Sequence, residues 1–222
     1  MQKRKEKKIQ FRKKTSAYII GMALLLFLSG LDLPNFGQES GVEMENKITL
    51  VPIGDIKAET LKVLSSHLKE TFSSQVKIHE AMELPEEAYN PKREQYFSSR
   101  LMNKLRSFIK PEPEEKILGI ADVDLYVHGL NFVFGEAELS GHFAIISLAR
   151  LRQSFYGLPD DKPLFFERVK KEAVHELGHA FGLNHCPNPD CVMHFSNSLG
   201  DTDRKSASFC LRCLGILKKR AT

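Results

Sequence analysis

The stretch that decides the fold of this chain runs from Val174 to Met193 and reads VHELGHAFGLNHCPNPDCVM. His175 and His179 are four residues apart, so on a helix they share one face and can bind the same ion. Glu176 lies beside them and is close enough to accept a proton from a water molecule at that ion. The spacing therefore predicts a helix that presents two metal ligands and a general base.

Gly182 and His185 extend this motif to HExxHxxGxxH. A glycine can adopt the left-handed conformation that ends a helix and turns the chain back, which brings a third imidazole from a loop. Three protein ligands leave one position open on a tetrahedral zinc ion, as catalysis requires. The alternatives are a histidine cluster without metal and a purely structural zinc, and the latter would leave Glu176 without a role.

The four cysteines of the chain predict a second metal site. They form the pairs Cys186-x4-Cys191 and Cys210-x2-Cys213, with eighteen residues between the pairs. Two close pairs of thiolates separated by a loop are typical of one structural zinc. Two disulfides are the alternative, and we favour zinc because CxxC is a common zinc half-site. Cys186 follows His185 directly, so a closed zinc site would hold the loop that presents the third histidine.

The combined pattern resembles the archaemetzincin family. Its motif HExxHxxGxxHCx4CxMx16CxxC is matched at every position, by His175, Glu176, His179, Gly182, His185, Cys186, Cys191, Met193, Cys210 and Cys213. The shorter part of the motif is the metzincin signature. Similarity continues upstream through ITLVPIG, AYNPKREQY, DVDLYVHGLNFVFGEAELSG and SLARL, so the resemblance covers roughly residues 47–216.

This resemblance implies a set of expectations. The three histidines would bind a catalytic zinc, the four cysteines a second zinc, and Met193 would be the methionine of the Met-turn beneath the histidines. The implied architecture is a metzincin-like zincin fold with a mixed twisted sheet, an active-site helix, a second helix and a compact zinc-stabilised C-terminal subdomain.

The segment 131–135 is expected to contact substrate. In metzincins an edge strand above the zinc pairs with extended substrate, and the free N–H and C=O groups of an edge strand suit that role. We assign it to Asn131, Phe132, Val133, Phe134 and Gly135, with an ordinary core strand as the alternative.

The first 31 residues form a basic segment followed by an apolar one. Eight Lys or Arg and a single acid, Glu6, occupy the first fourteen residues, and Ala17 to Leu31 is apolar. This order is typical of an export signal or a membrane anchor, which would place the enzyme outside the cytoplasm. Archaemetzincins are more usually regarded as soluble, so a cytoplasmic location is the alternative. Residues 32–46 are expected to be a linker and residues 47–222 the catalytic domain.

The net charge of +4 comes from this basic segment. Of 32 basic and 28 acidic residues, eight and one lie in the first fourteen positions, which leaves 24 basic and 27 acidic residues in the rest. The basic isoelectric point therefore gives no argument for nucleic-acid binding.

Hydrophobic periodicity predicts an α/β sandwich with a mixed sheet. Helical spacing occurs at residues 61–72, 95–109 and 161–181, the last being the active-site helix. The expected strands cover residues 47–53, 76–79, 117–123, 131–134 and 143–148.

The function predicted from these features is that of a zinc metallopeptidase with Glu176 as general base and a peptide or protein as substrate. A monomer is expected. A catalytically idle zinc-binding scaffold and a hydrolase of non-peptide amides are the alternatives. Endopeptidase and aminopeptidase action are not distinguished by the motifs.

Overall fold

A five-stranded mixed sheet is the centre of residues 46–220, the part of the chain that the computed structural model describes. The strand order is β2-β1-β5-β8-β7. The first four strands run parallel, and β7 is antiparallel to β8 and forms one edge. The strands are β1 (Lys47–Ile53), β2 (Gln75–Ile78), β5 (Glu115–Ala121), β7 (Gly135–Ala137) and β8 (Phe143–Ser147).

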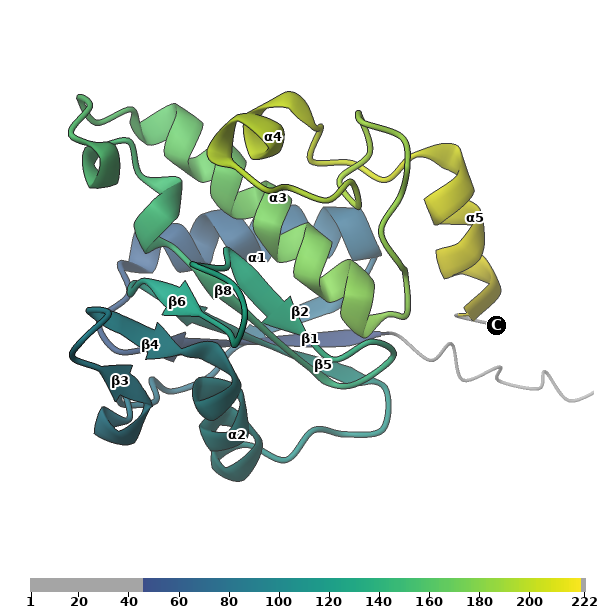
Figure 1. Ribbon diagram of the computed structural model, residues 1–222. Coiled ribbons are helices and arrows are strands. Elements are labelled where there is room, and N and C mark those ends of the chain that lie inside the picture. Colours follow the sequence, from purple (N-terminus) through teal and green to yellow (C-terminus); the bar gives the residue numbers. More distant parts are fainter. Residues whose placement is uncertain (1–45, 221–222) are drawn as a thin grey trace, which may run out of the picture. The chain divides into compact units, whose positions relative to one another are not determined.

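Helices cover both faces of this sheet (Figure 1). Side chains alternate along each strand, so Ile48 and Leu50 of β1 pack toward α1 (Ala58–Phe72) and α3 (Lys162–Ala180), whereas Val51 and Ile53 pack toward α2 (Ser98–Phe108). The strands β5 and β8 divide their side chains in the same way. Because both faces are covered, the central strands are almost continuously apolar.

Short elements surround this core. A second sheet has the order β3-β4-β6. After α3 the chain forms a long loop and two further helices, coloured yellow in Figure 1. These elements are η1 (Glu86–Ala88), β3 (Tyr89–Asn90), β4 (Gln95–Phe97), β6 (Leu125–Tyr126), η2 (Ala149–Leu151), η3 (Ser154–Tyr156), α4 (Leu199–Arg204) and α5 (Leu211–Arg220).

The α/β class, the mixed sheet and the active-site helix confirm the expectations, and the main differences concern residues 95–97 and 131–134. The helix expected from residue 95 begins at Ser98, because residues 95–97 pair as β4. The strand expected at residues 131–134 is wrong: Val133 makes one isolated bridge to Leu125, and the edge strand is β7. Alternation of apolar residues fits an extended segment as well as a strand, and only tertiary pairing distinguishes the two.

The predicted export or anchor segment, residues 1–31, and the linker up to residue 45 lie outside the described residues. Among the helices between residues 46 and 220, none has the length and apolar character needed to cross a bilayer.

Candidate active site and metal centres

Helix α3 carries His175 and His179 one turn apart, and both of its ends are well defined. The side chain of Asp161 caps the N-terminus by accepting a hydrogen bond of 2.9 Å from the backbone N–H of Leu164. The helix ends at Ala180, and Gly182 follows with a φ of +90°, a conformation that side chains other than glycine rarely adopt. The predicted turn at Gly182 is therefore present, and it returns the chain toward the helix.

The three histidines converge on one point. Among residues 46–220, the ligand nitrogens of His175, His179 and His185 form one group in which all lie within 4.8 Å of one another. Backbone carbonyls orient two of the rings: Nδ1 of His175 donates to the oxygen of Val192 at 2.8 Å, and Nδ1 of His179 donates to that of Leu183 at 2.7 Å. The Nε2 atoms are thereby left facing each other.

This geometry fits a metal ion. The Nε2 atoms of His175 and His179 are 3.1 Å apart, and two nitrogens bound to one tetrahedral zinc lie about 3.3 Å apart. Burial lowers the pKa of His175 well below its ordinary value, and it lowers that of His179 as well, so both rings stay in the neutral form that binds metals. A metal-bound histidine usually donates its other ring N–H to a carbonyl or carboxylate, as Nδ1 of each of these two rings does here.

Glu176 lies at the same site without belonging to the ligand group. Its side chain is buried, and Gly135 of the edge strand β7 lies directly against it: a Cβ atom at residue 135 would be 2.6 Å from Cγ and Oε1 of Glu176. Burial, and next the charge of Glu172, raise the pKa of Glu176 well above its ordinary value. A carboxylate in such surroundings takes up a proton readily.

Met193 packs against the same helix. Its side chain is fully buried, and its sulfur lies where a side chain on Gly178 would be, 2.4 Å from a Cβ atom built there. The turn around Met193 also contains Val192, whose carbonyl orients His175. Met193 therefore packs against the helix that carries His175 and His179, and its role as the methionine of a Met-turn stays a prediction.

The four cysteines lie in one cluster. Each cysteine of the first pair lies next to one of the second pair, which is 24 positions away for Cys186 and 22 positions away for Cys191. Sγ of Cys186 is 3.8 Å from that of Cys210, and Sγ of Cys191 is 3.8 Å from that of Cys213. All four thiols are free. Two sulfurs bound to one tetrahedral zinc lie about 3.8 Å apart, so the cluster has the dimensions of a closed zinc site.

The electrostatics of the cluster favour a thiolate at its rim. Cys210 immediately precedes α5. A hydrogen bond from the backbone N–H of Cys213 lowers the pKa of the Cys210 thiol to about 7. Burial raises the pKa of Cys191 and Cys213.

A cavity of about 430 Å³ contains the histidine site. All five residues of the predicted segment 131–135 line it, together with His175, Glu176, His179 and His185. Only Gly135 of that segment belongs to the edge strand, so the segment approaches the site mainly as a loop.

Other residues of the cavity were not predicted. The aromatic ring of Phe195 packs against the imidazole of His185, with 4.9 Å between the ring centroids. The side chains of Glu172 and Lys205 also line the cavity. Glu172 could have been noticed in the sequence, because it lies one helical turn before Glu176. No pattern in the sequence marks Lys205.

The family model described as Peptidase family M54 matches residues 49–219. The archaemetzincin of Methanocaldococcus jannaschii is 45% identical over 174 residues, which cover 78% of this chain and 94% of that protein. The archaemetzincin of Pyrococcus furiosus is 43% identical over 182 residues, which cover 80% of this chain and 95% of that protein.

Solved structures agree with these relatives. The crystal structure of archaemetzincin from Methanopyrus kandleri superposes with a TM-score of 0.70 at 41% identity, covering 79% of this chain and 95% of that one. That of archaemetzincin from Archaeoglobus fulgidus, complexed with malonate, gives a TM-score of 0.67 at 40% identity and covers 77% and 99%.

Proposed function

Because this chain belongs to peptidase family M54, the archaemetzincins, and is a zinc metallopeptidase, we propose that it hydrolyses peptide bonds in the cavity that contains His175, His179 and His185. The observation that carries this assignment is the convergence of three imidazoles, two of them oriented by backbone carbonyls, beside one buried carboxylate.

The three histidines would hold the catalytic zinc. When bound there, zinc supplies a Lewis acid that polarises the scissile carbonyl and makes water more acidic. The chain contributes the ligand geometry through the carbonyls of Val192 and Leu183, which orient two of the rings.

Glu176 is the general base in this proposal. Its carboxylate takes the proton of the attacking water and then delivers that proton to the nitrogen of the leaving amine. Two features support the role: the side chain is buried next to the histidines, and it lies outside the group of ligand atoms. A carboxylate with a raised pKa retains the proton long enough to pass it on.

Substrate would bind in extended form along β7. This strand is the edge of the sheet, and Gly135 brings its backbone into contact with Glu176. A peptide that adds to this edge would place its scissile bond beside the general base. Residues 131–134 would contact the substrate as a loop that lines the same cavity.

The four cysteines would hold a second, structural zinc. The two sulfur pairs at 3.8 Å match tetrahedral coordination, and Cys186 directly follows the ligand His185. This zinc would fix the loop after α3 relative to α5. We therefore propose two zinc ions per chain, one catalytic and one structural.

Glu176→Ala tests the catalytic assignment. We expect peptide hydrolysis to fall by about 10²-fold or more, with zinc content unchanged by elemental analysis. Glu167→Ala is the matched control, because Glu167 is an exposed glutamate on the same helix. Loss of zinc together with activity in Glu176→Ala would show that Glu176 is a structural residue.

The assay uses a peptide library with free and with blocked N-termini. Cleavage of both forms indicates an endopeptidase, and cleavage of only the free form indicates an aminopeptidase. Absence of cleavage by fully metallated protein would contradict the proposed activity.

We also propose that residues 1–31 export or anchor the peptidase outside the cytoplasm. Support comes from the basic block followed by an apolar run. Cell fractionation of the full chain and of a chain that lacks residues 1–31 tests this location. Recovery of both forms in the cytoplasm would contradict it.

A further inference from the structure

Lys205 has a fully buried side chain beside the active site. It directly follows α4, lines the same cavity as the histidines, and its side chain is 0% exposed. A buried ammonium group is costly unless it is paired and hydrogen-bonded. Its ion pair is with Glu172 of α3, at 3.2 Å between Nζ and Oε1.

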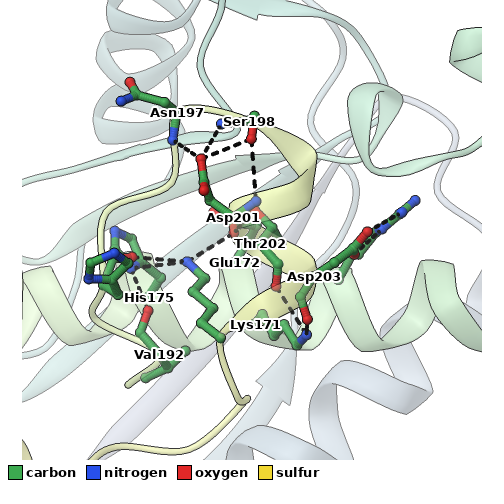
Figure 2. A network of polar contacts seen from close by, with 12 residues as sticks. Lys171, Glu172, His175, Val192, Asn197, Ser198, Asp201, Thr202 and Asp203 are labelled. Atoms are coloured by element: carbon green, nitrogen blue, oxygen red, sulfur yellow. Dashed lines mark hydrogen bonds and ion pairs between the residues drawn. The ribbon is translucent and has the colours of Figure 1, made fainter. Parts of the chain in front are cut away.

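Glu172 belongs to the face of α3 that carries the site. It lies three residues before His175 and four before Glu176, so the three side chains are neighbours along the helix. Thr202 of α4 donates a second hydrogen bond to Oε1 of Glu172, at 3.1 Å. Figure 2 shows Glu172 and Thr202 in the network that connects α4 to α3.

Lys205 also contacts the turn that orients His175. Its ammonium group donates to the carbonyl of His194 at 3.4 Å. Two residues earlier in the same turn, the carbonyl of Val192 accepts the hydrogen bond from Nδ1 of His175 (Figure 2). Nζ of Lys205 is 3.5 Å from that Nδ1, which already donates to Val192, so this contact is a close approach of the cation to the ring edge.

We propose that Lys205 is a positioning residue for the metal ligand His175. Its ammonium group contacts Glu172 on the helix and the carbonyl of His194 in the turn, and so holds the turn at a fixed distance from the helix. That distance sets the hydrogen bond between Nδ1 of His175 and the carbonyl of Val192. The inference rests on the proposed zinc site at the histidines. Mutation of a group that orients a metal-bound histidine typically lowers metal affinity or activity 10- to 100-fold.

A role in docking α4 alone does not account for Lys205. Arg168 already joins α3 to α4 through two hydrogen bonds of 2.6 Å to Asp203, and Lys171 donates to the carbonyls of Thr202 and Asp203 at 3.0 Å. These contacts lie farther toward the start of α3. Lys205 differs from them because its contacts include the ligand His175 and the turn that supports it.

Lys205→Met is the direct test, because methionine has a similar length and no charge. We expect the zinc dissociation constant of the histidine site to rise 10- to 100-fold and kcat to fall by a similar factor. Chelator competition measures the zinc affinity, and His179→Ala identifies which step of the titration belongs to the histidines. The kcat is measured at saturating zinc on a peptide that the parent protein cleaves.

Asp203→Asn is the matched control. It weakens another polar connection between α3 and α4, the one between Arg168 and Asp203, which does not involve His175. We expect a lower melting temperature with unchanged zinc affinity. If Lys205→Met also lowers only the melting temperature, the ion pair has a purely structural role and the proposal is overturned.

The double variant Lys205→Met/Glu172→Gln separates positioning from charge compensation. It removes both members of the buried pair, so it folds even if Lys205→Met does not. Positioning predicts that stability returns while zinc affinity stays weak. Return of parental zinc affinity would show that Lys205 only compensates the charge of Glu172, which would refute the proposal.

The parent protein separates failure of this inference from failure of the proposed site. If the parent binds no zinc at the histidines, the zinc site itself is wrong. If the parent binds zinc there and Lys205→Met binds it equally tightly, only the role of Lys205 is wrong.

Discussion

Gly135 is the residue at which the edge strand and Glu176, the proposed general base, meet. Its missing side chain leaves room for the carboxylate of Glu176, which lies 2.6 Å from the place where a Cβ atom would be. Because that space lies on β7 and Glu176 lies on α3, the sheet edge and the active-site helix determine together where the carboxylate points.

Gly135→Ala tests this close contact. The added methyl group must displace Glu176, so we expect kcat to fall by about 10²-fold, as for loss of a well-placed acid–base group. Zinc content should not change, because the three atoms nearest to the added methyl group all belong to Glu176, which is outside the group of candidate ligands. The measurement is steady-state hydrolysis together with elemental analysis.

Gly215→Ala is the control for this substitution. A Cβ atom at Gly215 of α5 meets nothing within 4 Å, so activity should stay at the parental level. Stability should rise by about 1 kcal/mol, because alanine favours helix more than glycine does. Parental kcat in Gly135→Ala would show that Glu176 can move aside without losing its function.

At the scale of elements, the cysteine cluster connects the loop after α3 to the start of α5. Cys186 and Cys191 belong to the loop, whereas Cys210 and Cys213 lie at the start of α5. The same loop contains His185 and Met193, so the two candidate metal sites share one connecting segment. Loss of the second site should therefore affect the first.

Replacement of Cys210 and Cys213 by serine tests this connection. We expect zinc content to fall from two ions to one per chain and stability to fall by more than about 4 kcal/mol, as for loss of a bound metal. The measurements are elemental analysis and chemical denaturation.

Leu211→Ser is the matched control between the two cysteines. Its side chain is 89% exposed, so neither zinc content nor stability should change appreciably. Two zinc ions per chain in the double cysteine variant would exclude the cysteines as ligands. A disulfide in the parent protein would exclude the structural zinc as well.

At the scale of the whole molecule, the described residues carry both faces of the core and both candidate metal sites. The match to the family model, residues 49–219, lies within the described residues. The alignments with the two archaemetzincin relatives cover 94% and 95% of those proteins. The excess of positive charge instead lies in the first fourteen residues.

A chain that begins at Asn46 should therefore fold by itself and hydrolyse the same peptides with the same kcat/KM. It should also elute earlier than the full chain from a cation exchanger, because it lacks the basic block. Thermal denaturation and gel filtration report on folding. An aggregated or unfolded product would show that the catalytic domain extends into the preceding residues.

The sequence by itself determined which histidines and cysteines are candidate metal ligands, which carboxylate is the proposed general base, and the helix that carries two of the histidines. These features are local: the spacing of His175 and His179 on a helix and the turn at Gly182 follow from backbone geometry alone. The two close cysteine pairs were likewise visible as half-sites before their partners were known.

Only the tertiary structure decided the surroundings of Glu176 and His175. Gly135 meets Glu176 because the edge strand β7 packs against α3, and Lys205 meets Glu172 and the turn at His194 because α4 packs against the same helix. Residues 135 and 176 are 41 positions apart, residues 172 and 205 are 33 apart and residues 194 and 205 are 11 apart, and no periodicity records these contacts. Their physical basis is the packing of separate elements against one another, which also explains why the edge strand lies at residues 135–137 instead of 131–134.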